Sequence, residues 1–206
     1  MTLPFAVSLH DRIGDALAQL VSVLAIPVLL LALAALLACA LECGRFAMEA
    51  SQRRGRRRRW PLRALAARAV ASPGEAAQLA THAPSSFAAT AVTQLAAAVS
   101  AARPQAAEHA LADFELAVQK RLDRTRMLVR AGPAIGLMGT LIPLAPGLEA
   151  LSDGDIGQLA SDLRIAFAAT VVGLLVGTVA FALTLTRTRM YTEDLTALER
   201  AAEAVA

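Results

Sequence analysis

Three long apolar blocks without a charged residue constrain this chain more than any other feature. They cover residues 16–41, 131–148 and 165–185, and none of them contains Asp, Glu, His, Lys or Arg. About 20 apolar residues in a helix are enough to cross the hydrocarbon of a bilayer. The composition agrees with this, because 56% of the residues are hydrophobic but only 4% are aromatic, which is not typical of a soluble core. We therefore expect an all-α integral membrane protein with three transmembrane helices.

The first block could instead be a cleaved signal peptide. Asp11, Arg12 and Asp15 precede it, so the positively charged start of a signal peptide is missing, and the apolar run is too long. The sequence LLAC at Cys39 resembles a lipoprotein cleavage site, but the same two objections apply. Cys39 and Cys43 stand without a nearby His or further Cys, so we expect small buried hydrophobic residues and no metal site.

The basic residues predict the direction in which the chain crosses the membrane. They gather after the first block, before the second and after the third, whereas the other side has only Arg12 and Arg164. Cytoplasmic segments are enriched in Lys and Arg, which places the N-terminus outside and the C-terminus inside. The expected remaining segments are an external N-terminus (1–15), a cytoplasmic helical region (42–130) with a basic segment (53–63), a short external acidic loop (149–164) and a cytoplasmic C-terminal helix (186–206).

The basic segment has two interpretations, as a nucleic-acid site or as a topology anchor that touches anionic lipid headgroups. A cluster beside a membrane span, without a series of stacking aromatic residues, favours the anchor. We therefore expect membrane lipids and no nucleic acid as partners. The anchor residues are Arg53, Arg54, Arg56, Arg57, Arg58 and Arg59.

The region between the first two spans is rich in alanine and is expected to be helical. Helix breaks are predicted at 72–74 (SPG) and 83–86 (APSS), and a new helix is predicted to start at Arg103-Pro104. That helix runs into the second span, and the C-terminal tail continues the third, so both helices should extend into a cytoplasmic bundle. The three histidines are scattered, and no phosphate loop, metal spacing or nucleophile elbow is present. We therefore expect no enzyme activity, no catalytic residue and no cofactor.

Small residues form a stripe on the second and third spans. Stripe residues on the third span fall at i, i+3, i+7 and i+14, which is one helical face, and the second span repeats that spacing. Small residues permit close helix approach, and threonine adds a polar group inside the membrane. The two stripes are Thr170, Gly173, Gly177 and Thr184, and Pro133, Gly136, Thr140 and Gly147.

Two further prolines weaken the second span near its outer half. Pro143 and Pro146 cannot donate a hydrogen bond to the carbonyls of Gly139 and Ile142. An unpaired carbonyl is tolerated in a membrane only where it faces protein or water. The helix could therefore line a polar path, or it could be a kinked packing helix that conducts nothing, and the sequence leaves both open.

The motifs in this region resemble the MotA/TolQ/ExbB proton-channel family. The stretch RAGPAIGLMGTLIPL fits its GP-x-x-GL-x-GT pattern, and LRIAFAATVVGLLVGTVAFAL fits its A-x-x-T-x-x-GL pattern. The similarity extends over about residues 114–191, and the expected topology is that of the TolQ/ExbB-like branch. The matching residues are Gly132, Pro133, Gly136, Leu137, Gly139, Thr140, Ala166 (or Ala168), Thr170, Gly173 and Leu174.

The resemblance implies a proton-channel subunit of an envelope motor in the inner membrane. A pentamer of this chain would surround a dimer of a single-span ExbD/TolR-like partner that carries a membrane aspartate. Thr140 and Thr170 would face that aspartate along the ion path, and proton flow would move the partner to power transport or envelope work. The residues expected at the pore and in helix packing are Pro133, Gly136, Gly139, Pro143, Gly173 and Gly177.

This chain departs from the pattern of the family at three places. Ala169 stands where many members have the first of two threonines, Arg164-Ile165 replaces the neighbourhood of a glutamate, and Pro143 and Pro146 replace glycine-rich sequence. The alternative function is a non-conducting structural scaffold of a membrane complex. An independent solute transporter is disfavoured because three spans without an internal repeat lack the usual architecture for alternating access.

Overall fold

The computed structural model describes residues 4–203, apart from the side chains of residues 4–11, 15, 18, 22 and 56–59. Within this part of the chain every secondary-structure element is a helix, and three helices are long and apolar enough to cross a membrane, as predicted. Part of the expected external N-terminus, the side chains of Arg56, Arg57, Arg58 and Arg59, and residues 204–206 lie outside the described residues. The elements are α1 (Pro4–Arg59), α2 (Leu62–Ala71), the 3₁₀ turn η1 (Pro73–Glu75), α3 (Ala76–Ala80), α4 (Ser86–Ser100), α5 (Pro104–Ser152) and α6 (Ile156–Glu203).

The predicted helix breaks between the first two spans are confirmed. α2 ends before Ser72, where Pro73 cannot supply the next helical N–H. α4 begins after Ser85, whose hydroxyl accepts a 3.2 Å hydrogen bond from the N–H of Ala88 and so caps the helix. α5 begins at Pro104, a favourable residue for a first helical turn.

The segment 149–164 differs from the expected loop, because most of it is helical. α5 continues to Ser152 and α6 begins at Ile156. Gly154 turns the chain with a φ of +81°, and the N–H of Asp155 reaches back 2.8 Å to the carbonyl of Ala150, which closes the end of α5. The Asp155 carboxylate accepts a 2.9 Å hydrogen bond from the N–H of Gln158 and caps α6. Local capping therefore shortens the turn to three residues.

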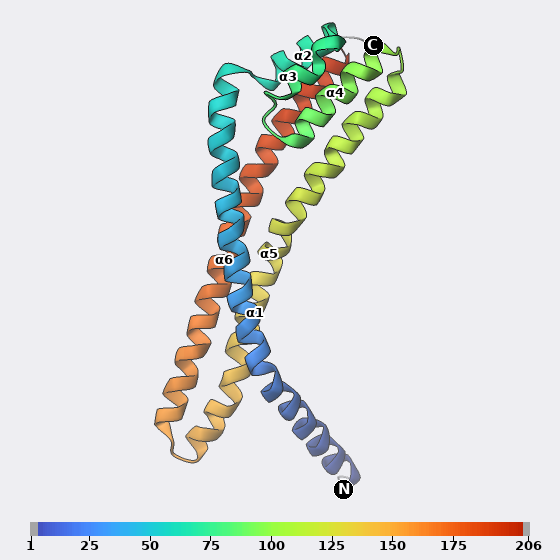
Figure 1. The fold of residues 1–206 in the computed structure, drawn as a ribbon. Coiled ribbons are helices and arrows are strands. Elements are labelled where there is room, and N and C mark those ends of the chain that lie inside the picture. Colours follow the sequence, from blue (N-terminus) through green and yellow to red (C-terminus); the bar gives the residue numbers. More distant parts are fainter. Residues whose placement is uncertain (1–3, 204–206) are drawn as a thin grey trace. The chain divides into compact units, whose positions relative to one another are not determined.

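The chain divides into two compact units, to which the three long helices all contribute. The first, here called the apolar unit, comprises residues 4–40 and 127–180 of the described chain. In it the second half of α5 and the first half of α6 form an antiparallel hairpin (Figure 1). α1 contacts α6 here, where the thiol of Cys39 points at the carbonyl of Val176 at 3.9 Å. Large aliphatic side chains such as Leu141, Val171 and Leu174 remain exposed, which suits a lipid or protein environment rather than water.

The second unit, here called the polar unit, comprises residues 41–126 and 181–203. Here α2, α3 and α4 gather beside the first half of α5 and the last part of α6 (Figure 1). The buried core is built mainly from alanine and leucine, with one large ring, Phe114, from α5. Phe87 of α4 packs against that ring and against Tyr191 of α6, with centroid distances of 5.5 and 5.3 Å. These apolar contacts tie the short helices to the two long ones.

Candidate functional site

The two spans with small-residue stripes meet backbone to backbone. A Cβ atom built on Gly173 of α6 would lie 2.6 Å from both the carbonyl oxygen of Gly132 and the Cα of Gly136 on α5. A Cβ on Gly132 would lie 2.8 Å from the carbonyl oxygen of Gly173 and from the nitrogen of Gly177. No side chain fits between such atoms, so glycine is required here for the helices to approach so closely.

The same contact continues along the hairpin in both directions. A Cβ on Gly139 would lie 2.5 Å from the methyl group of Ala169, which is buried. A Cβ on Gly177 would lie 2.9 Å from the ring carbons of Pro133. Ala169 therefore fills the space in front of a glycine, and the extra atoms of a threonine at this position would have little room. This contact gives a packing reason for one departure from the family pattern.

The prolines of α5 do not break the helix, because α5 is continuous from Pro104 to Ser152. Pro133 packs against Gly177, so the wide proline ring is matched by the smallest residue on the neighbouring helix. Pro143 is partly buried and Pro146 is exposed. Of the three prolines, Pro133 is thus the one that belongs to the glycine contact between α5 and α6.

Thr140 and Thr170 lie beside this contact. The hydroxyl of Thr140 donates a 2.7 Å hydrogen bond to the carbonyl of Leu137, and that of Thr170 donates to the carbonyl of Ala166 at 3.4 Å. The Cα of Thr170 would lie 3.4 Å from a Cβ on Gly136. Both threonines are partly exposed. Each hydroxyl proton is engaged within its own helix, while each hydroxyl oxygen keeps the capacity to accept a further hydrogen bond.

The described anchor residues have different surroundings. Arg54 is exposed, in line with a surface role, whereas the side chain of Arg53 is only 9% exposed. Arg53 Nη1 donates a 2.7 Å hydrogen bond to Asp194 Oδ2 of α6. The structure thus places Arg53 in an ion pair between two helices of the polar unit rather than at the surface.

A cluster of buried charges in the polar unit was not found by sequence reasoning. Arg187 of α6 is completely buried, and its Nη1 donates a 2.7 Å hydrogen bond to Glu42 Oε2 of α1. The hydroxyl of Tyr191 donates to Glu49 Oε1 at 2.8 Å. We call this set the charged cluster, and it consists of Glu42, Glu49, Arg53, Arg187, Tyr191 and Asp194.

The charged cluster sets the relative direction of two helices. Glu42 of α1 pairs with Arg187 of α6, and Arg53, farther along α1, pairs with Asp194, farther along α6. The two helices therefore run parallel in the polar unit. The sequence contained a signal for it, because Glu42 and Glu49 are seven residues apart, as are Arg187 and Asp194. This spacing places each pair on one helical face directly after an apolar block.

No metal centre accompanies either group of residues. Among the residues that the structure describes, no three His, Cys, Asp or Glu side chains are arranged to hold a metal ion.

A comparison with protein-family models finds a match for the part of the chain that contains the hairpin of α5 and α6. The family model described as "MotA/TolQ/ExbB proton channel family" matches residues 80–200, which is more than half of the chain and includes nearly all of α5 and α6. No curated protein and no solved structure is similar enough to this chain to count as a match.

Proposed function

The chain belongs to the MotA/TolQ/ExbB proton channel family, and from this premise we propose that it is the proton-channel subunit of an ExbB/TolQ-like motor of the cell envelope. Three apolar helices and the family together indicate a multi-pass membrane protein with a proton-channel role. The proposal adds the inner membrane, a homopentamer and a single-span ExbD/TolR-like partner with a membrane aspartate. Proton flow would move that partner and so power transport or envelope work.

The observation that supports the proposal best is the chemistry beside the glycine contact. Hydroxyls are present there, but the three apolar blocks contain no Asp, Glu, His, Lys or Arg. A proton crosses hydrocarbon only with a titratable group or a continuous chain of water, and intramembrane ionisable groups mark such paths. Since threonine does not titrate near neutral pH, the carboxylate would have to come from another helix.

The hydrogen bonds of Thr140 and Thr170 suggest how a partner carboxyl group would be received. Because both hydroxyl protons already point to helix carbonyls, the two oxygens are ready acceptors for the O–H of a protonated carboxyl group. An ionised carboxylate needs donors instead, so each hydroxyl would have to rotate away from its carbonyl. In this arrangement the two threonines would therefore bind the protonated carboxyl group of the partner. Loss of that proton would weaken the binding, so that the partner moves away from the threonines.

The close contact of α5 and α6 would supply the rigid wall for this exchange. Backbone atoms that meet without intervening side chains leave little freedom for the hairpin to slide. We therefore assign movement to the partner and a stationary role to this chain. The glycines and Pro133 act in helix packing, whereas the two threonines act on the ion path.

The test is proton flux into liposomes that contain this chain together with its single-span partner. Thr→Val at position 140 or 170 retains the shape and removes the hydroxyl, so proton flux should fall at least tenfold while assembly stays unchanged. Thr178→Val is the matched control, because Thr178 is an exposed threonine on the same helix α6, and it should leave the flux unchanged. Liposomes with this chain alone should show no flux.

The alternative function, a non-conducting scaffold, predicts no proton flux even in liposomes that contain this chain together with its partner. Two other results would contradict the proposed ion path itself. Full activity of the Thr140→Val/Thr170→Val double variant would show that the hydroxyls do not contribute to an ion path. Proton flux through this chain alone would show that no partner carboxylate is needed. Either result would refute the proposed mechanism.

A further inference from the structure

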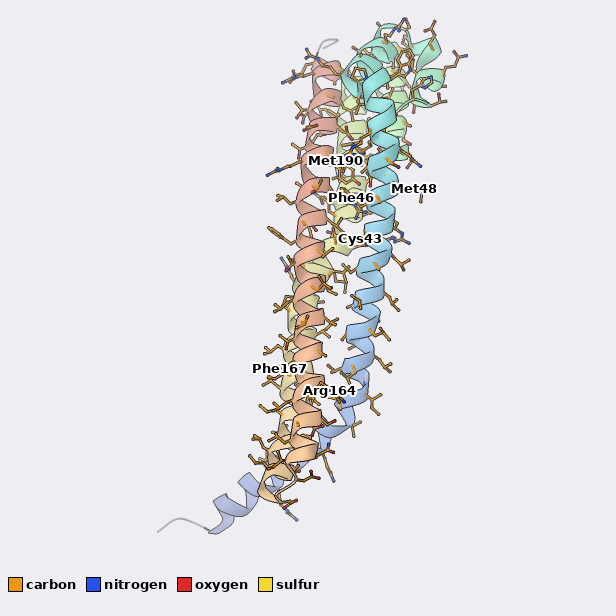
Figure 2. The ribbon with its side chains drawn as sticks, turned by 90° about the vertical axis from the view of Figure 1, so that its left-hand side faces the viewer. Cys43, Phe46, Met48, Arg164, Phe167 and Met190 are labelled. Carbon is orange, nitrogen blue, oxygen red and sulfur yellow. The ribbon has the colours of Figure 1, made fainter. Side chains whose placement is uncertain are left out.

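The polar unit contains a pocket of about 770 Å³ between α1, α2 and α6. Phe46 of α1 and Met190 of α6, both labelled in Figure 2, line it together with Trp60 and Pro61. Its volume lies in the range of small-molecule sites, which are about 300–1,000 Å³. The pocket is separate from Thr140 and Thr170, and the proposed proton path does not use it.

The lining of the pocket is rich in positive charge. Among the residues that the structure describes, four arginines line it, against two acidic side chains. One of the acids, Asp194, already accepts a hydrogen bond from Arg53. The other three arginines are exposed at the surface of the unit, so they could turn toward an anion without breaking a buried contact. The charged residues of the lining are Arg53, Arg54, Arg63, Arg200, Glu193 and Asp194.

Arg53 is the buried arginine of the lining. Its side chain is 91% buried, and its Nη2, which solvent does not reach, has no hydrogen-bond partner among the residues that the structure describes. Its Nε lies 3.3 Å from Glu49 Oε1 but is also without a hydrogen bond. Buried polar groups are nearly always paired, because an unpaired one costs about 1–3 kcal/mol and more when it is charged. The Arg53 guanidinium lies over the ring of Tyr191, 5.1 Å from its centroid, so Arg53 adds fixed positive charge to the wall of the pocket. The donors that can reach a ligand are those of the exposed arginines, and a phosphate group accepts hydrogen bonds from two guanidinium nitrogens at once.

The remaining lining consists of apolar residues and three threonines. Phe46, Trp60 and Met190 are the largest of the apolar residues, and the Trp60 ring is stacked on His82 at a centroid distance of 5.1 Å, which holds the indole in place. The apolar part of the lining can also receive an apolar or flat part of a ligand, whereas the arginines alone receive its anionic group.

We propose that this pocket binds a soluble small molecule that carries a phosphate group. The position of the arginines favours a soluble anion over a membrane phospholipid. Arg53 follows Leu41, the last residue of the first apolar block, by 12 residues, which is about 18 Å of helix. The headgroup layer extends only about 5–8 Å beyond the hydrocarbon. The phosphate of a lipid in its normal position would thus fall short of Arg53.

The test uses the fluorescence of Trp60, which is the single tryptophan of the chain. The full-length protein is placed in phosphatidylcholine nanodiscs and titrated with inorganic pyrophosphate, with sodium chloride at equal ionic strength as the reference. We expect a saturable change of Trp60 emission that chloride does not produce. Arg54→Gln/Arg200→Gln, which alters only exposed side chains, should raise the half-saturation concentration at least tenfold.

Two further variants distinguish binding in the pocket from a general effect of protein charge and from a loss of folding. Arg126→Gln removes an exposed arginine that does not line the pocket, and it should leave the titration unchanged. Arg53→Gln/Asp194→Asn removes both members of the buried pair together, so that neither charge is left alone, and it should abolish the response.

Three results would overturn the inference. The first is the absence of a saturable change on addition of pyrophosphate, and the second is a response that Arg126→Gln weakens as much as the pocket variant does. A response to phosphatidylglycerol nanodiscs without any response to pyrophosphate would assign the pocket to a lipid headgroup instead. None of these measurements involves proton flux, so their outcome is independent of the proposed channel function.

Discussion

Arg187 is completely buried between two carboxylates. Its Nη1 lies 2.7 Å from Glu42 Oε2, and its Nε lies 3.8 Å from Glu49 Oε2. Its guanidinium also lies over the ring of Phe46, 5.8 Å from the centroid. Two of its nitrogens, Nε and Nη2, have no hydrogen-bond partner among the residues that the structure describes. A buried ion pair of this kind adds little stability compared with an apolar pair, but the loss of one partner is costly. At the residue scale, the charged cluster is therefore sensitive to single substitutions.

We expect Arg187→Met to lower the free energy of unfolding by about 3 kcal/mol, because the buried Glu42 then keeps only Arg45, a half-exposed partner whose Nη1 lies 2.8 Å from Glu42 Oε1. The measurement is denaturant unfolding of the detergent-solubilised protein. Arg126→Met is the control, since Arg126 and Asp123 form an exposed ion pair that contributes at most about 1 kcal/mol. The double variant Arg187→Met/Glu42→Gln should recover part of the loss. Equal effects of Arg187→Met and Arg126→Met would contradict the importance of the buried pair.

At the scale of elements, the hairpin of α5 and α6 depends on glycines that touch the backbone of the neighbouring helix. Gly173 is surrounded by backbone, because backbone atoms of both Gly132 and Gly136 lie within 3 Å of the position that its Cβ would take. Backbone cannot move aside as the end of a flexible side chain can. Since these contacts lie within one chain, a larger residue at position 173 would act first on the hairpin and only then on an oligomer.

We expect Gly173→Ala to destabilise the protein by about 1–3 kcal/mol, the range found for overpacked cores. The control is Gly44→Ala in α1, where a Cβ would meet nothing within 4 Å. There alanine should be neutral or should stabilise by up to about 1 kcal/mol, because glycine is a poor helix former. Thermal unfolding of both variants in the same detergent tests this. The packing model is wrong if Gly173→Ala is as stable as Gly44→Ala.

At the scale of the whole molecule, the relative directions of the three long helices limit the ways in which the chain can cross a membrane. α1 and α6 run parallel in the polar unit, and α5 and α6 run antiparallel in the apolar unit. Three spans that cross the membrane in alternate directions require both relations. Which end lies in the cytoplasm depends on the arginine distribution alone.

Cysteine labelling of intact cells tests that orientation. In a chain with Cys39→Ala and Cys43→Ala, a membrane-impermeant maleimide should modify Asp153→Cys in the turn between α5 and α6. It should leave Arg54→Cys unmodified, because the positive-inside bias places this exposed residue in the cytoplasm. Both sites should react once the membrane is dissolved. Labelling of position 54 but not 153 in intact cells would reverse the orientation.

Much of the fold could be predicted from the sequence, because local signals determine it. Uncharged runs of about 20 residues predict spans, and Ser-Pro-Gly or Ala-Pro-Ser-Ser predicts a helix end regardless of distant contacts. The turn near Gly154 was predicted too long, because capping by Asp155 depends on backbone geometry rather than composition. For the candidate site, the sequence identified the small-residue stripes but not the partner of each glycine.

By itself, the sequence determined that this chain is helical, that it has three membrane segments and that two of them carry glycines and threonines at helical spacing. These properties follow from periodicity and hydropathy, which act over neighbouring residues. Only the tertiary structure decided that Gly173 faces Gly132 and Gly136, that Ala169 faces Gly139, and that Arg53 and Arg187 are buried against Asp194 and Glu42. The physical reason is that pairing depends on the register between helices that are far apart in the chain. In the same way, the sequence around a charged residue does not reveal whether an opposite charge from a distant segment will pair with it and bury it.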